Sequence, residues 1–165
     1  MSLRGIPLLI LALIIYNAIV YFHPFLASLI PHVFAQGETP QEIFYGVPAL
    51  DAAGKNVITK GGEFLTIPLP GGPVQVRLGD AMITLGIILM GIEMAKATYT
   101  RGFGLIDRLL SPVLFMLFLL EFLLVPPCGT SVFFFLTVMA GIDVIAGEVV
   151  GIRSAARNIN FGNAN

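Results

Sequence analysis

The sequence is poor in charge. Only 12% of its residues are charged and 56% are hydrophobic, whereas soluble domains carry about 25% charged residues. Together with several long apolar runs, this deficit indicates an integral membrane protein. The formal net charge of −1 gives no basic surface for nucleic acid, so we expect no nucleic acid among the partners.

Cysteine and catalytic motifs are also scarce. The single cysteine, Cys128, excludes an internal disulfide and a cysteine-based metal cluster. The two histidines, His23 and His32, are separated by two prolines and lack metal-ligand spacing. No HExxH motif, Ser-His-Asp order or phosphate-binding glycine loop occurs. The sequence therefore predicts no catalytic residue, no metal and no cofactor, and a protein that is not an enzyme.

Four apolar runs have the length of a membrane-spanning helix, about 20 residues. They cover residues 6–23, 81–98, 109–126 and 131–152. We therefore predict an all-α integral membrane protein in which four transmembrane helices form one bundle, with residues 1–165 as a single membrane domain. The tail after the last run is expected to fray.

The first apolar run has two interpretations. Arg4 and the small-residue site at 33–35 also fit a secretory signal peptide. The run is longer than a signal-peptide core and ends well before that site, which favours a retained helix. Pro24 is expected to interrupt or kink this helix, so that residues 24–35 emerge from the membrane.

The polar stretch 36–79 is expected to form an extracytoplasmic loop. Within it, two β-prone runs, 64–69 and 74–78, flank a Pro-Gly-Gly-Pro turn and predict a short β-hairpin over 64–78. Pro68 limits the first run to an edge strand. Because a lone hairpin is marginally stable in water, we expect it to rest on the membrane surface, on the rest of the loop or on a neighbouring subunit.

Lysine and arginine predict the orientation. The cations cluster in the terminal segments and in the short connection between the second and third runs, whereas the long loop mixes its cations with acids. The positive-inside rule therefore places both termini in the cytoplasm and the long loop outside, in a multi-pass protein of the plasma or inner membrane. The cations on the inner side are Arg4, Lys96, Arg101, Arg108, Arg153 and Arg157.

Three carboxylates lie deep within the predicted spans: Glu93, Glu121 and Asp143. The helical rise places them about 8, 18 and 14 Å from the inner ends of their helices, with Asn17 near the level of Glu121. An acid at the centre of a membrane helix costs about 2.5–3.5 kcal/mol, so each needs a partner. We expect Glu93 to pair with Lys96. The other two acids have no local partner, which favours an interhelical hydrogen bond, with proton or ion handling as the alternative.

Small residues form one face of the last predicted helix. Ala140, Gly147 and Gly151 share this face with Asp143 at helical spacing. The pattern favours close packing against another helix, either of this chain or of a copy. The opposite surface can face lipid, with contributions from Phe133, Phe134, Phe135, Val144 and Val149.

These features favour a non-enzymatic scaffold or accessory subunit in the lipid bilayer. It would form a homo-oligomer or join a larger membrane complex through the small-residue face and the outer hairpin. The alternative is proton or cation conduction along a helix-lined path, with Glu121, Asp143 and Glu93 as relay points. A third, weaker hypothesis is a small molecule or lipid bound near Asn17 and Glu121.

Overall fold

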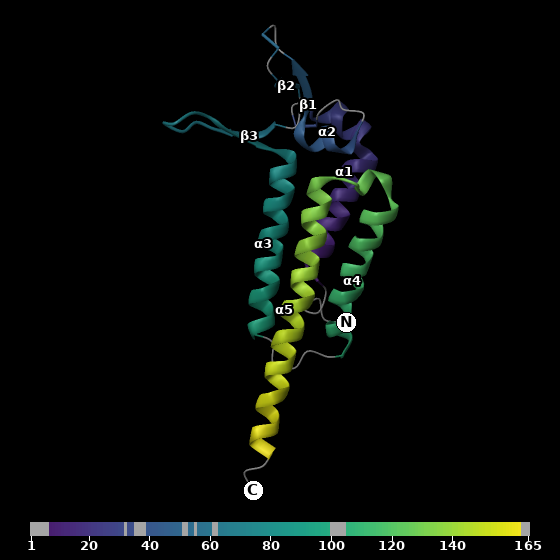
Figure 1. Ribbon diagram of the computed structural model, residues 1–165, viewed down its shortest axis with the longest axis vertical. Coiled ribbons are helices and arrows are strands. Elements are labelled where there is room, and N and C mark those ends of the chain that lie inside the picture. Colours follow the sequence, from purple (N-terminus) through teal and green to yellow (C-terminus); the bar gives the residue numbers. More distant parts are fainter. Residues whose placement is uncertain are drawn as a thin grey trace.

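A computed structural model describes residues 7–31, 33–34, 39–50, 53–54, 56–60, 63–99 and 105–162 of the chain. The chain is mainly helical, and four long helices lie side by side beneath a small cap of strands and one short helix (Figure 1). The long helices are α1 (Leu9–Leu29), α3 (Leu78–Tyr99), α4 (Leu105–Leu124) and α5 (Ser131–Gly162).

Three of the long helices are apolar over a length that can cross a membrane. Their apolar stretches are Leu9–Leu29, Leu78–Lys96 and Ser131–Val149. The stretch in α4 is shorter, Leu109–Leu124. The fold prediction is therefore confirmed in part. The protein is mostly helical with three candidate membrane spans, and the fourth span stays a prediction.

Helix α1 is not interrupted at Pro24. It continues to Leu29, and the N–H of Ile30 still donates to the Leu26 carbonyl at 2.8 Å. Of the two predicted effects of this proline, the interruption does not occur, and the kink stays a prediction. A proline removes one hydrogen-bond donor from a helix, and neighbouring groups in membrane proteins commonly compensate for that loss.

Helix α5 is longer than the predicted span. It extends over 32 residues to Gly162, so it is about 48 Å long and exceeds the hydrocarbon thickness of about 30 Å. Its C-terminal part extends past the ends of α3 and α4 (Figure 1). The helix continues through the basic segment that follows the apolar stretch. It includes the polar tail, predicted to fray, as far as Gly162, and residues 163–165 lie outside the described residues.

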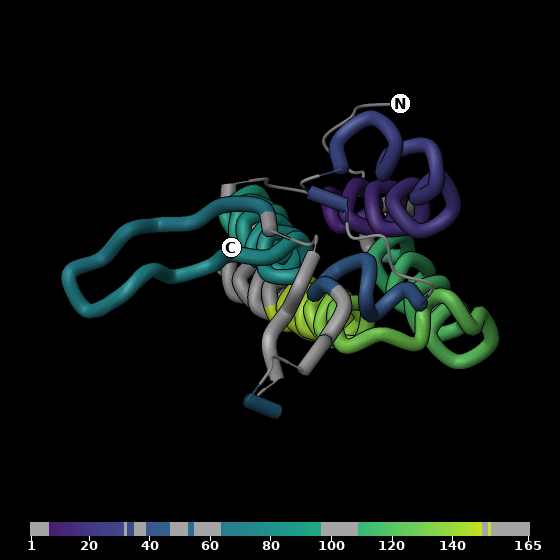
Figure 2. Tube along the Cα trace, turned by 90° about the horizontal axis from the view of Figure 1, so that it is seen from above, coloured from purple at the N-terminus to yellow at the C-terminus, as the bar shows by residue number. Residues whose placement is uncertain are grey.

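The long helices pack around α5, which contacts both α3 and α4, while α1 contacts α3 and α5 (Figure 2). A glycine allows the closest approach between α3 and α5. A Cβ atom at Gly86 would lie 2.7 Å from Leu136 Cδ2 and 2.9 Å from Met139 Sδ. An added Cβ would have to push aside the ends of the Leu136 and Met139 side chains, so a glycine at this position favours the close contact between these helices.

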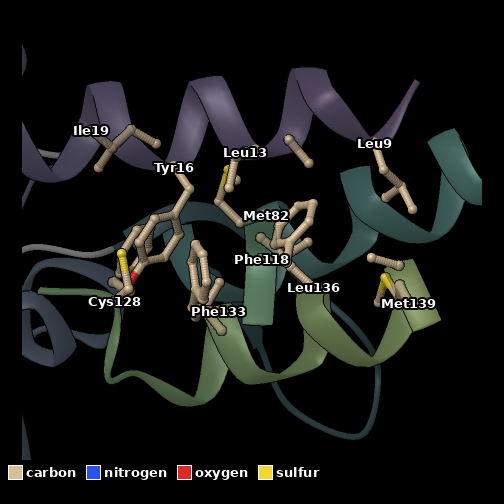
Figure 3. Packing of buried hydrophobic residues seen from close by; sticks show 14 of the residues in the cluster. Leu9, Leu13, Tyr16, Ile19, Met82, Phe118, Cys128, Phe133, Leu136 and Met139 are labelled. Atoms are coloured by element: carbon tan, nitrogen blue, oxygen red, sulfur yellow. The ribbon is translucent and has the colours of Figure 1, made fainter. Parts of the chain in front are cut away.

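The centre of the core is aromatic. Tyr16 of α1, Phe118 of α4 and Phe133 of α5 are each 0% exposed (Figure 3). The ring of Phe133 lies edge-on to Tyr16 at a centroid distance of 4.7 Å and 5.5 Å from the ring of Phe118. The prediction that Phe133 faces lipid is therefore wrong, because its side of α5 faces α1 and α4.

The cap contains a short helix that the sequence analysis missed. Helix α2 (Pro40–Tyr45) begins with a capping box, in which Thr39 and Glu42 accept hydrogen bonds from each other's backbone N–H groups. A Thr followed three residues later by a Glu is a recognised start signal for a helix. Phe44 of this helix is buried against the bundle.

Two antiparallel hairpins complete the cap. Strand β1 (Val47–Leu50) pairs with β2 (Asn56–Lys60), and β3 (Glu63–Ile67) pairs with β4 (Val74–Arg77). The β3–β4 hairpin lies where the sequence predicts one. The β1–β2 hairpin was not predicted.

Candidate functional site

Most polar groups inside the bundle form two clusters, one near the cap and one near the opposite end. Two buried polar residues are not included in either cluster: His23 of α1, and Thr137 of α5, whose hydroxyl donates to the Phe133 carbonyl at 2.9 Å. The outer cluster consists of Tyr16, Asn17, Glu121, Cys128 and Thr130. The inner cluster consists of Glu93, Lys96, Ser111 and Asp143, together with the backbone N–H of Leu8.

In the outer cluster, Asn17 and Glu121 join α1 to α4. The Nδ2 atom of Asn17 donates to Oε2 of Glu121 at 2.9 Å, and it also lies 3.2 Å from the carbonyl of Leu13 one turn earlier. Glu121, which has no partner on its own helix turn in the sequence, thus has one on a neighbouring helix. A short interhelical bond of this kind offsets part of the cost of an acid among apolar helices.

Tyr16 connects α1 to the turn that precedes α5. Its hydroxyl lies 2.6 Å from Thr130 Oγ1 and donates to the Pro127 carbonyl at 3.1 Å. The Thr130 hydroxyl in turn accepts the N–H of Phe133 at 3.2 Å and so caps α5. The Tyr16 ring also stacks on Phe44 of α2 at a centroid distance of 4.9 Å. One side chain therefore contacts three separate elements.

Cys128 is the member of this cluster that comes from the short helical turn η2 (Pro126–Cys128). Its thiol is buried, 3.9 Å from Glu121 Oε2 and 4.0 Å from Asn17 Oδ1. Burial, and then the neighbouring Glu121 carboxyl, raise the pKa of Cys128 to about 12. Because the thiolate is the reactive form of cysteine, this thiol is expected to be chemically inert at neutral pH.

In the inner cluster, Glu93 of α3 caps the N-terminus of α1. Leu8 provides no side-chain cap, and its backbone N–H donates to Glu93 Oε2 at 2.8 Å. The first N–H groups of a helix lack acceptors within the helix, and a carboxylate there also interacts favourably with the helix dipole. Lys96, the predicted partner, also acts on Glu93 electrostatically.

Asp143 of α5 is only 6% exposed. Its carboxyl has a side-chain hydrogen bond with Ser111 of α4, and Lys96 acts on it electrostatically. Glu93 and Asp143 are themselves electrostatic neighbours. The structure thus brings these two acids together, whereas the predicted depths separated them.

A layer of apolar side chains separates the two clusters. Leu13 is 4% exposed, and Phe118 and Leu136 are 0% exposed. Figure 3 shows them between Tyr16 and Cys128 at one end and Leu9 at the other. The acids therefore form two local groups rather than one line through the bundle.

The residues of the predicted small-residue face differ in their surroundings. Ala140 is 2% exposed and packs inside the chain, next to buried Asp143. At Gly147 an added Cβ would meet no atom within 4 Å, so this part of α5 is open. The surroundings of Gly151 lie outside the described residues.

The buried polar groups of the described residues are satisfied within the chain. Every buried side-chain nitrogen and oxygen among them has a hydrogen-bond partner. The same part of the chain holds no group of three His, Cys, Asp or Glu residues that could bind a metal. The buried polar groups thus act on one another and on the backbone. Searches of protein-family models, curated proteins and solved structures find no match to this chain.

Proposed function

We propose that all four long helices cross the membrane. Helix α3 begins at the cap and runs away from it, and α5 also begins at the cap end (Figure 1). Helix α4 connects the far end of α3 to the start of α5. It must therefore run back toward the cap through the same thickness of membrane. Its 20 residues extend about 30 Å, which matches the hydrocarbon layer. The positive-inside rule then places the cap outside and both termini in the cytoplasm of a plasma or inner membrane.

We further propose that the protein is a non-enzymatic scaffold or accessory subunit that self-associates or joins a larger membrane complex. The observation that carries this proposal is the internal pairing of the buried acids. Glu121 is bonded to Asn17, Glu93 caps α1, and Asp143 is bonded to Ser111. Acids used in this way hold helices together and leave no group in the described core unpaired for chemistry.

The open part of α5 is the best surface for such association. Ile145, Val149 and Ile152 are 65%, 43% and 68% exposed and share one face of α5, whereas Gly147, which has open space around it, lies on the opposite face of the helix. A small residue in an apolar membrane helix permits the backbone of a second helix to approach closely. The Gly147 face therefore supports close contact with a helix of a second copy or of a larger complex.

Native mass analysis and cross-linking in mild detergent test this proposal. We expect the wild-type protein to form dimers or larger assemblies, or to co-purify with another membrane protein. Gly147→Leu should weaken that association. Gly91→Leu is the matched control, because Gly91 of α3 also has nothing within 4 Å of an added Cβ. A wild-type protein that is only monomeric, with no co-purifying protein, would exclude the scaffold role.

Proton or cation conduction is the alternative function. The proximity of Glu93 and Asp143 favours it, because two neighbouring carboxyls can share or pass a proton. The apolar layer at Leu13 and Phe118 would have to open before such a proton reached Glu121. Flux through reconstituted vesicles that disappears with Asp143→Asn and Glu121→Gln would support conduction, and an absence of wild-type flux would remove it.

A further inference from the structure

The β3–β4 hairpin forms an arm that leaves the bundle sideways. The arm comprises β3, β4 and the turn between them, residues 63–77. It extends across the axis of α3 and away from the other long helices, as two perpendicular views show (Figures 1 and 2). The β1–β2 hairpin instead points away from the bundle end (Figure 1). The two hairpins of the cap therefore meet different surroundings.

The arm carries four apolar side chains on one face, whereas the other face carries a polar pair together with Phe64, which is 55% exposed beside the register shift at Glu63 and Leu65. Its register pairs Leu65 with Val76 and Ile67 with Val74. Residues opposite each other in an antiparallel pair point to the same side, so these four side chains share one face. The intervening pair, Thr66 and Gln75, lies on the other face. Residues 64–76 contain no charged side chain.

The apolar face is not covered by the described part of the chain. Leu65 is 51% exposed, Ile67 is 40% exposed and Val74 is 47% exposed. A two-stranded hairpin is marginally stable by itself in water, so it needs a surface to rest on. The rest of the loop does not cover the apolar face of the arm. The two surfaces that remain are the membrane surface and a neighbouring subunit.

The direction of the arm is fixed at its base. The Arg77 guanidinium donates from Nη1 to the Tyr45 carbonyl at 2.7 Å, and the Arg77 backbone N–H donates to Asp80 Oδ2 at 2.9 Å. The Tyr45 ring lies over Gly79, where an added Cβ would come within 2.7 Å of Cζ. Strand β4 passes directly into α3 at Leu78. The arm is thus tied to both α2 and the start of α3.

We propose that this arm lies in the outer interfacial layer of the bilayer, with its apolar face toward the acyl chains. The apolar span of α3 begins at Leu78, one residue after the arm ends, so the arm leaves α3 at the membrane boundary. Since it extends across the helix axis, it lies along the membrane plane. An amphipathic, uncharged segment in that plane buries its apolar face in the boundary between headgroups and acyl chains. The inference rests on the proposed membrane span of α3 and goes beyond the proposed association, because it assigns the arm to lipid.

Tryptophan fluorescence gives a direct test, because the chain contains no tryptophan. A single Leu65→Trp substitution places the only indole on the apolar face, and Thr66→Trp places it on the opposite face of the same strand. Ile67→Trp repeats the apolar position in case Leu65→Trp fails to fold. Each full-length variant is reconstituted into phosphatidylcholine vesicles, with or without lipids brominated on their acyl chains.

We expect the two apolar-face variants to emit at shorter wavelength than Thr66→Trp. Because an interfacial amphipathic segment buries its apolar face about 5–10 Å into the boundary, brominated lipid should quench them at least about twofold more strongly than Thr66→Trp. A blue-shifted indole that brominated lipid does not quench would mean that protein covers the face, and would overturn the proposal. Emission at the wavelength of water-exposed indole at both faces would overturn it as well.

Discussion

The hydrogen bond between Asn17 and Glu121 should contribute measurably to the stability of the bundle. The perturbation is a double-mutant cycle with Asn17→Ala, Glu121→Ala and the combined variant. Double-mutant cycles on hydrogen bonds between membrane helices give coupling free energies of about 0.6 kcal/mol on average and about 1.7 kcal/mol at most. The donor–acceptor distance is 2.9 Å, and Cys128 contacts the same two side chains. We therefore expect a coupling free energy of about 1 kcal/mol.

The assay is reversible unfolding in mixed micelles, with the free energy of unfolding extrapolated to zero denaturing detergent. Glu121→Gln is the matched control, because its side-chain oxygen can still accept from Asn17 Nδ2 and should preserve most of the coupling. Mutations at independent sites add within about 0.3–0.5 kcal/mol. A coupling within that range would refute the argument that this bond joins α1 to α4 energetically.

Three further predictions concern the caps, the packing and the buried thiol. Glu93→Ala should destabilise the first turn of α1 by about 0.5–2 kcal/mol, the usual value of a helix cap, and should speed hydrogen exchange at the Leu8 amide. Gly86→Leu should lower the free energy of unfolding by about 1–3 kcal/mol through overpacking, whereas Gly91→Leu, in open space, should not. Because the pKa of Cys128 rises from 9.0 to about 12 on folding, the unfolded thiol ionises first, so stability should fall as pH rises through this window. Alkylation of Cys128 at neutral pH should be slow by mass spectrometry, and rapid labelling of the folded protein would show that the thiol is accessible.

The sequence predicted the apolar helices and one hairpin because both depend on local patterns. A run of apolar residues marks a helix that can lie in a bilayer, and two β-prone runs around Gly71 and Gly72 mark a hairpin. The similar depths of Asn17 and Glu121 in the membrane could also be predicted, because depth follows from the number of residues along each helix. Their hydrogen bond required, in addition, that α1 and α4 be neighbours, which no local pattern indicates.

The inner cluster could not be derived in the same way. The predicted depths assumed that the helices end at one level, whereas α5 extends past α3 and α4. This offset brings Asp143 to Ser111 and near Glu93, although the depths had separated them. The partner of Glu93 is a backbone N–H of Leu8, and a backbone group leaves no signal in a sequence.

The exposure of α5 could be predicted only in part. Phe133 was assigned to the surface opposite the small residues, but it lies two helical turns before Ala140 and therefore on the same face of α5. In the structure it lies against Tyr16 and Phe118, since α5 contacts other helices on more than one side. Helix α2 is a different case, because its capping box at Thr39 and Glu42 was visible in the sequence and short helices of this kind are easily overlooked.

The central claim is that the buried acids hold a closed bundle together and do not carry ions. Proton flux into vesicles that contain the purified protein and a trapped pH-sensitive dye tests it most directly, with empty vesicles as the baseline. We predict that wild type, Glu121→Gln and Asp143→Asn all match the empty vesicles. Wild-type flux above that baseline, abolished by either substitution, would contradict the account.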